Sequence, residues 1–189
     1  MNRLSCLVAL PLLAACAAPL PYGETIPRPL VMGPYVVTPP PSKWHPAPGA
    51  VGATYVHEES NALHTMAIRV LPVVPPDDLR DAQKFIDTAK RYNADRLDPD
   101  KQQVIQESYA PVTVNGLACI AYEVDGADRG IKQGASTPFV IVGQLCRHPW
   151  HPDWIDVSFA ERGGEGGVRP DVREAGAKVL ASLRALEPR

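Results

Sequence analysis

The sequence predicts a single α+β domain, in which an antiparallel sheet of about six strands, in the order ββαββββα, carries two packed helices. Two patterns lead to this fold class. Strand-like runs follow one another through short turns, and two other segments repeat apolar residues at the helical spacing. The composition agrees, because 45% of the 189 residues are hydrophobic and only 21% are charged, as in a globular chain. We expect this domain to occupy residues 50–189.

The first three elements are expected between residues 50 and 92. Runs rich in β-forming residues at 50–57 and 63–73 flank a polar turn at 58–61, which favours a hairpin. The Pro-Pro-Asp-Asp stretch at 75–78 then ends the strand and opens a helix, because aspartate favours the first helical turn. One apolar face of this helix is formed by residues three or four positions apart, namely Leu79, Ala82, Phe85, Ile86, Ala89 and Tyr92.

Four strands and a second helix complete the predicted order. The runs at 104–114 and 117–125 flank Asn115-Gly116, a dipeptide typical of the two-residue type I′ hairpin turn. Two further runs, at 137–147 and 154–161, are joined by a turn-rich segment. Pro170 and Asp171 then open a helix, whose apolar stripe consists of Val172, Ala175, Val179, Leu180, Leu183 and Leu186.

The N-terminus has the features of a secretion signal. Arg3 precedes an apolar run at 4–13 that is too short to span a bilayer as a helix. The stretch Leu13-Ala14-Ala15-Cys16 resembles the lipobox of bacterial lipoproteins. This resemblance implies that residues 1–15 are removed and that Cys16 is acylated as the new first residue. The alternative is an ordinary secreted protein, cut near Ala15 or Ala18.

By the same resemblance, Ala17 lacks the aspartate that commonly signals retention in the inner membrane, which implies the outer membrane, facing the periplasm. Residues 16–49 are then expected to be the lipidated cysteine and a proline-rich tether. Ten prolines lie between residues 19 and 48, and extended polyproline chain would let 33 residues reach as far as about 100 Å. Pro39-Pro40-Pro41 is also a possible ligand for an aromatic groove.

The four cysteines agree with this compartment. Cys6 leaves with the signal peptide and Cys16 takes the lipid, so Cys119 and Cys146 remain in an oxidising environment that favours a disulfide. The strand register also permits the bond. If 117–125 pairs with 137–147 so that Asp125 faces Val140, the two cysteines face each other at a Cα separation suited to a disulfide.

No linear catalytic motif is present, and the chain contains no Gly-x-Ser-x-Gly, Ser-x-x-Lys, phosphate-loop or Cys-x-x-Cys sequence. The richest candidate recognition surface is therefore the loop that contains His148, Trp150, His151 and Trp154, because tryptophan is enriched at binding hot spots. Two alternatives stay open for this loop. The tryptophans cover the core, or His148, His151 and Asp153 serve a small hydrolase or metal-dependent enzyme, with Cys146 as a further metal ligand.

A second histidine pair lies in the first predicted hairpin. A turn centred between residues 60 and 61 places His57 directly opposite His64 on the same face of the strands. A metal held by this pair with Glu58 or Glu59 is one interpretation, and a solvated polar pair beside a turn is the other. No third histidine or cysteine stands at a ligand spacing beside this pair, and the sequence predicts no cofactor.

The element order, together with the lipobox, resembles the PsbP-like α/β/α domains found in bacterial lipoproteins. The resemblance implies an accessory or binding role rather than catalysis. The charges are balanced, with 19 basic and 21 acidic residues, which excludes a strongly basic nucleic-acid surface. We therefore expect a non-catalytic envelope lipoprotein that is held by its lipid in the membrane and binds an envelope protein or a wall component.

Overall fold

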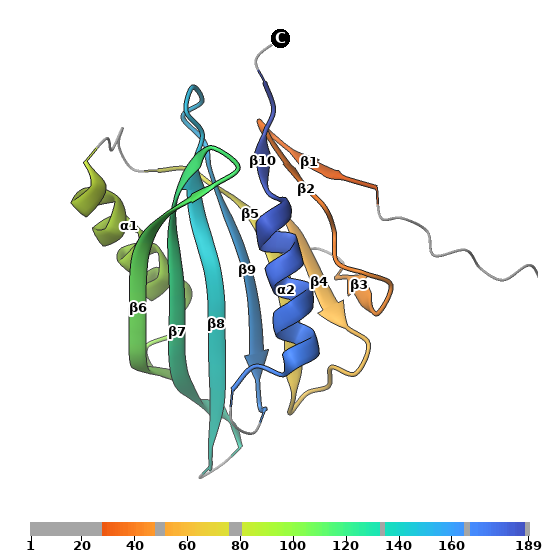
Figure 1. Ribbon diagram of the computed structural model, residues 1–189. Helices are drawn as coiled ribbons and strands as arrows, with labels where there is room; N and C mark the ends of the chain where they lie inside the picture. Colours follow the sequence, from red (N-terminus) through yellow and green to blue (C-terminus); the bar gives the residue numbers. More distant parts are fainter. Residues whose placement is uncertain (1–27, 48–51, 76–80, 133–134, 165–166, 188–189) are drawn as a thin grey trace, which may run out of the picture.

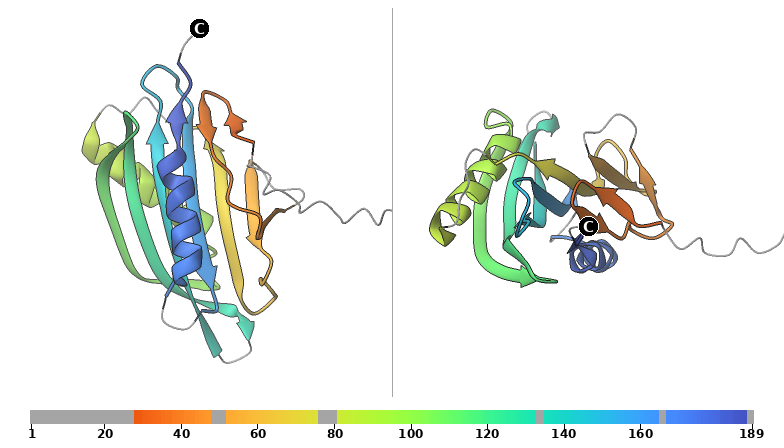
Figure 2. Two further views of the ribbon diagram at one scale, coloured as in Figure 1. Left: turned by 45° about the vertical axis from the view of Figure 1, so that its right-hand side comes forward. Right: turned by 90° about the horizontal axis from the view of Figure 1, so that it is seen from above.

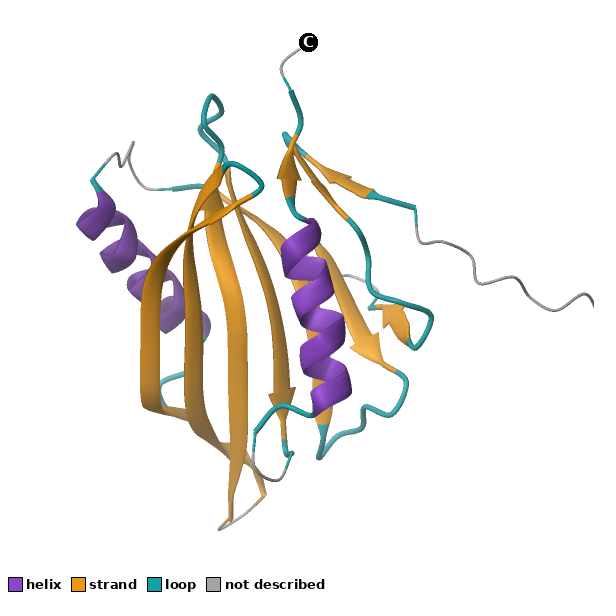
Figure 3. Ribbon diagram, in the orientation of Figure 1, coloured by secondary structure: helices purple, strands orange, loops and turns teal. Residues whose placement is uncertain are grey.

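The computed structural model describes residues 28–47, 52–75, 81–132, 135–164 and 167–187. Within these ranges the chain forms two helices and two antiparallel sheets, which confirms the α+β class (Figures 1 and 3). The large sheet has seven strands in the order β3-β4-β5-β9-β8-β7-β6, and the small sheet has the order β1-β2-β10. The elements are β1 (Leu30–Met32), β2 (Tyr35–Val37), β3 (Trp44–Pro46), β4 (Ala53–His57), β5 (Thr65–Val73), α1 (Ala82–Arg96), β6 (Gln102–Val114), β7 (Leu117–Lys132), β8 (Ala135–Arg147), β9 (Trp154–Arg162), α2 (Pro170–Ser182) and β10 (Arg184–Ala185).

The two helices lie on opposite faces of the large sheet, as Figure 2 shows from two directions. Successive side chains of β9 point alternately to the α1 face and to the α2 face of the sheet. Ile155 belongs to the hydrophobic core that includes Val172 and Val179 of α2, whereas Trp154 belongs to the core around Phe85 of α1. Because both faces of β9 are covered, the strand is buried along nearly its whole length.

Local sequence explains where α1 begins. The side chain of Asp81 accepts hydrogen bonds from the backbone N–H groups of Gln83 and Lys84, at 2.8 and 3.1 Å. These contacts satisfy donors that have no partner inside the helix. The helix therefore starts several residues later than the expected start beside the aspartates at 77–78, which lie outside the described residues.

The hairpin between β6 and β7 confirms the prediction made from Asn115-Gly116. Both residues have positive φ angles, of 47° and 81°, as a type I′ turn requires. The Asn115 side chain also donates from Nδ2 to the carbonyl oxygens of Ala181 and Leu183, at 2.9 and 2.8 Å. The turn therefore fastens the hairpin to the end of α2.

The described part of the expected tether, residues 28–47, is not a spacer, and here the prediction is wrong. It contributes β1, β2 and β3, and Tyr35, Val37 and Trp44 are buried in the core on the α2 side of the sheet. The prolines fit this structure because they lie in turns, at strand ends or on an edge strand, where no ladder hydrogen bond is needed. The domain therefore begins near residue 30 instead of residue 50.

The first hairpin forms, but its predicted register is wrong. Val56 lies opposite Ala67, and His57 lies opposite Trp44 of β3. The expected pairing of His57 with His64 fails because Asn61 closes a local turn. Its Oδ1 accepts from the backbone N–H groups of residues 63 and 64, at 2.9 and 3.0 Å, so the connection is longer and β5 begins at Thr65.

Two other boundaries differ from the prediction. Strand β7 continues to Lys132 and strand β8 begins at Ala135, so both extend beyond the expected bounds at residues 125 and 137. Leu186 belongs to no helix, because α2 ends at Ser182 and the chain continues as β10. Among the described residues, neither helix combines the length and the apolar composition that crossing a membrane requires.

Candidate functional site

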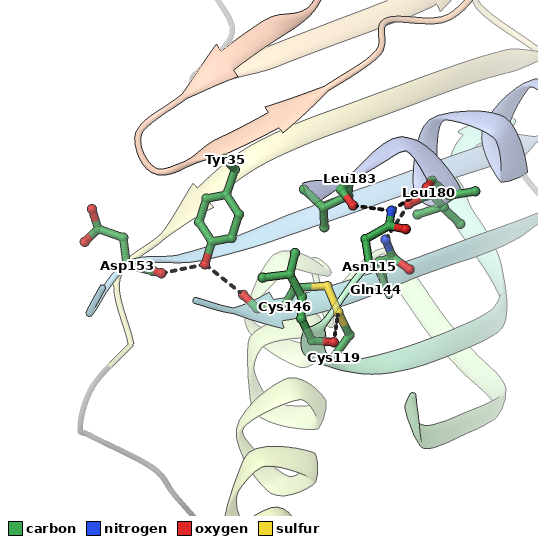
Figure 4. The surroundings of a disulfide bond; sticks show 10 residues. Tyr35, Asn115, Cys119, Gln144, Cys146, Asp153, Leu180 and Leu183 are labelled. Atoms are coloured by element: carbon green, nitrogen blue, oxygen red, sulfur yellow. Dashed lines mark hydrogen bonds between the residues drawn. A yellow bond between two sulfur atoms is a disulfide. The ribbon is translucent and has the colours of Figure 1, made fainter. Parts of the chain in front are cut away.

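The loop 148–153, which joins β8 to β9 at one end of the sheet, contains most of the residues that the sequence singles out. Tyr35 of β2 contacts the end of this loop, because its hydroxyl donates to the carbonyl oxygen of Asp153 at 2.7 Å (Figure 4). Burial raises the pKa of Tyr35 well above its usual value, so this hydroxyl stays a donor. Sequence analysis missed Tyr35 because proline-rich sequence surrounds it.

His148 supports the loop from within. The side chain is buried, its Nδ1 accepts from the backbone N–H of Trp150 at 3.2 Å, and its ring meets the Tyr35 ring edge-on at 5.5 Å. Its Nε2 is buried and has no hydrogen-bond partner among the described residues. The expected recognition role of His148 is therefore replaced by a structural contact that orients the next residues.

The two tryptophans of the candidate loop have opposite surroundings. Trp150 is 75% exposed, whereas Trp154 is 4% exposed and meets Phe85 of α1 edge-on at 4.8 Å. One tryptophan thus covers the core, as the alternative interpretation proposed, and the other projects into solvent. A large exposed indole on a fixed loop is the feature of this site that is best suited to contact a partner.

Two more exposed apolar side chains lie at the same end of the sheet. Val74 follows Val73, the strand partner of Trp154. Leu186 donates its backbone N–H to the carbonyl oxygen of Pro34, at 2.7 Å, directly before Tyr35. We call this end of the sheet, with Trp150, Val74 and Leu186, the apical surface.

The disulfide between Cys119 and Cys146 forms as predicted, in the predicted register (Figure 4). Cys119 lies opposite Cys146, and Asp125 lies opposite Val140. Both cysteines are buried, and Cys146 lies two residues before His148. The covalent bond therefore fixes the last residues of β8 from which the apical loop leaves.

A separate group of polar side chains is buried on the α1 face. The Asp156 carboxylate accepts from Arg96 Nη1 at 2.8 Å and from the Tyr122 hydroxyl at 2.5 Å, and Ser158 Oγ lies 3.3 Å away. Gly143 makes room for this arrangement, since a Cβ there would lie 2.5 Å from the Tyr122 oxygen. All these partners come from the protein itself, so we assign the group to holding the end of α1 against the sheet.

A carboxylate near the start of β9 is the signal that the sequence-based prediction overlooked. Asp156 interrupts an apolar strand and lies between Leu71 and Leu145 on the neighbouring strands. A fully buried carboxylate requires a charged or hydrogen-bonding partner. The sequence alone does not show that Arg96 and Tyr122, from two other elements, would supply it.

The proposed metal ligands do not come together. His64 Nε2 lies 2.6 Å from Glu161 Oε1, whose other oxygen accepts from the backbone N–H of Arg169 at 2.7 Å. His57 instead packs edge-on against Trp44 at 5.0 Å. In the part of the chain that the structure describes, no three histidine, cysteine, aspartate or glutamate side chains are grouped to hold a metal ion.

The alternative catalytic set also lacks a common centre. His151 Nδ1 lies 3.4 Å from Asp153 Oδ2 in an exposed pair, whereas the buried His148 ring is centred 6.2 Å from that of His151. Cys146 is consumed by the disulfide. Cys16 and the rest of the predicted lipobox lie outside the described residues.

The fold defines a class of proteins in which two helices cover the two faces of an antiparallel sheet. No family model matches the sequence, and no curated protein matches it. Among solved structures, the Ran-binding protein Mog1p of Saccharomyces cerevisiae is similar, with a TM-score of 0.52 and 13% identity over 82% of this chain and 92% of that one. This similarity shows the fold.

Two further solved structures match less closely. LpqN, involved in cell envelope biogenesis of Mycobacterium tuberculosis, has a TM-score of 0.49 and 12% identity over 84% of this chain and 90% of that one. The cyanobacterial PsbP of Synechocystis has a TM-score of 0.45 and 11% identity over 89% of this chain and 98% of that one.

Proposed function

We propose that this protein is a non-catalytic lipoprotein of the cell envelope, whose domain binds an envelope protein through the apical surface. The lipobox-like Leu13-Ala14-Ala15-Cys16 supports the anchor and the periplasmic location. Mog1p, which shares the fold, is a Ran-binding protein by name, so this architecture serves protein binding in at least one case.

The exposed indole of Trp150 is the observation that carries the proposal. Tyr35, His148 and the disulfide hold the segments on both sides of this residue, so its backbone is ordered before a partner arrives. A preorganised aromatic side chain loses little conformational entropy when it binds. A monomer gains no stability from an indole in solvent, whereas a protein interface gains from burying one.

The experiment compares Trp150→Ala with the unchanged chain in cells, by crosslinking and identification of the captured protein. We expect the variant to lose the specific partner, because removing a hot-spot tryptophan costs about 2 kcal/mol or more, which is about 30-fold in affinity. Trp150→Phe should retain part of the binding. The matched control is Ile105→Ala on β6, because Ile105 is 71% exposed but lies on the edge strand, outside the apical surface.

Three results would overturn the proposal. One is capture of the same protein, at the same yield, by the Trp150→Ala chain. Another is a large loss of thermal stability in that variant, which would show that Trp150 is structural in solution. The third is an equal loss of capture in Ile105→Ala, which would assign the interaction to exposed apolar side chains in general.

A further inference from the structure

A pocket of about 260 Å³ lies between α2 and the strands β3 and β4. Its floor is apolar and comes from Trp44 and Ala175, which are both buried. Its rim carries charged side chains from both sides, including Lys43 from the strand side and Glu174 and Lys178 from the helix. The pocket is separate from the apical surface.

His57 brings an unused donor to this pocket. The side chain is only 4% exposed, and its Nδ1 accepts from the backbone N–H of Glu59 at 3.3 Å. This contact places the imidazole proton on Nε2. In the described part of the protein nothing accepts a hydrogen bond from Nε2, although the residue lines the pocket.

Some charged side chains around the pocket form ion pairs and others do not. Glu174 is paired with Lys178 at 2.7 Å, and Asp171 is paired with Arg169 at 2.8 Å. Lys43 forms no ion pair within 4.0 Å among the described residues, although its charge helps to lower the pKa of Glu59. The rim carboxylates of Asp171 and Glu174 are therefore paired, while the Lys43 ammonium and the His57 Nε2–H can donate to a ligand.

We infer that this pocket binds a small organic carboxylate. The carboxylate would accept from His57 Nε2 and from the Lys43 ammonium, and the apolar body would lie on Trp44 and Ala175. A charged acceptor suits these donors better than a neutral one, since hydrogen bonds to ionised groups are the stronger kind. This inference does not depend on the proposed role of Trp150.

The volume limits the size of the ligand. A cavity of about 150 Å³ holds benzene, with six heavy atoms, so 260 Å³ accommodates roughly ten heavy atoms by the same ratio. Benzoate is therefore a suitable probe, because its nine heavy atoms are roughly 90% of that limit. Benzyl alcohol is nearly the same size and has no charge, so the comparison isolates the carboxylate.

The test is an NMR titration of the full chain with benzoate, benzyl alcohol and inorganic phosphate. We expect benzoate to shift the backbone signals of Trp44 and Ala175 saturably, and to bind at least ten-fold more tightly than benzyl alcohol. Lys43→Gln should weaken benzoate binding at least ten-fold. The matched control is Lys84→Gln, because Lys84 is also exposed but lies on α1, on the other face of the sheet.

Three results would overturn the inference. Equal binding of benzyl alcohol would show that the site selects only an apolar body. Equal losses in Lys43→Gln and Lys84→Gln would indicate a general charge effect. Saturable binding of phosphate with the same signal shifts would indicate an unselective anion site. Because Lys43 is an exposed residue, the Lys43→Gln chain should remain folded, and its melting temperature verifies this.

Discussion

At the residue scale, Asp156 shows how one charged side chain organises a buried region. Its carboxylate receives Arg96 from α1 and Tyr122 from β7, so one residue joins three elements. Removing a single partner of such a group leaves a buried charge uncompensated, which costs about 3–5 kcal/mol. The group therefore specifies where α1 lies, beyond what the apolar contacts of Phe85 determine.

The ionisation of Tyr122 gives a pH-dependent test of this arrangement. Burial, and then the negative charge of Asp156, raise the pKa of Tyr122 well above its usual value. A tyrosine in the unfolded chain ionises near pH 10, at about its ordinary pKa, so the unfolded state loses its proton first. The stabilisation is therefore complete below about pH 10 and decreases as the pH rises further, by up to about 1.4 kcal/mol per pH unit.

Above about pH 10 the free energy of unfolding should decrease with pH, and Tyr122→Phe should remove the part of that decrease that Tyr122 causes. Urea unfolding between about pH 10 and 12 measures it. Tyr35 and Tyr92 also have raised pKa values, so part of the slope should remain. Between pH 7 and 9, where these tyrosines are protonated in both states, the slopes of the two proteins should coincide. Identical slopes above pH 10 would refute the assignment.

At the element scale, the sequence predicted best where a local signal determines the structure. Asn115-Gly116 determined a turn and the register of β6 against β7, in which Val114 lies opposite Leu117. The register of β7 against β8 was predicted from the position at which the two cysteines face each other, and Cys119 does lie opposite Cys146. The prediction failed where the structure depends on distant contacts. Strands β1 and β2 have only three residues each. All of β2 is buried, and Leu30 and Met32 of β1 are partly buried, because they pack in the core that α2 and the large sheet form.

In the candidate site, too, local features were predicted and features that depend on distant contacts were not. The sequence identified the apical loop from its aromatic residues, but it did not distinguish the exposed Trp150 from the buried Trp154. That difference arises because Trp154 is already part of β9 and faces α1. The role of Tyr35 was also missed, because the proline-rich residues around it were expected to form a tether. A single aromatic residue there gives no helical or alternating hydrophobic pattern.

The disulfide between β7 and β8 provides the prediction at this scale. Cys119 and Cys146 are 27 residues apart in sequence, and closing such a loop stabilises the fold by about 3.5 kcal/mol in the chain-entropy model. Reduction should therefore lower the melting temperature by roughly 10 °C for a domain of this size. Calorimetry with and without reductant measures the change.

The double variant Cys119→Ala/Cys146→Ala is the control for this measurement. It should melt near the temperature of the reduced protein and should not respond to reductant. If the unchanged protein, purified without reductant, releases two thiols from these positions on unfolding, the bond does not form. The apical loop should also lose order on reduction, because Cys146 lies two residues before His148.

At the scale of the whole molecule, the start of the domain near residue 30 shortens any spacer between anchor and domain. Cys16 and Leu30 are separated by 14 residue steps in the sequence, and a fully extended chain covers at most about 50 Å over that length. The proline-rich sequence predicted a reach of about 100 Å. With the proposed anchor at Cys16, we therefore expect the apical surface to lie closer to the membrane than the sequence alone suggested.

We expect the proposed interaction to be weaker without the proposed anchor. Cys16→Ala should move the protein from the membrane fraction to the periplasmic fraction, because a multiply acylated cysteine anchors stably and a bare chain does not. It should also reduce capture of a membrane-bound partner in cells, since tethering raises the effective concentration of the domain. The melting temperature should stay unchanged.

Two results would contradict this prediction. A mature chain without an acyl group at Cys16, as seen by mass spectrometry, would contradict the anchor. Undiminished capture of the partner by the soluble Cys16→Ala chain would contradict the role of the anchor in binding.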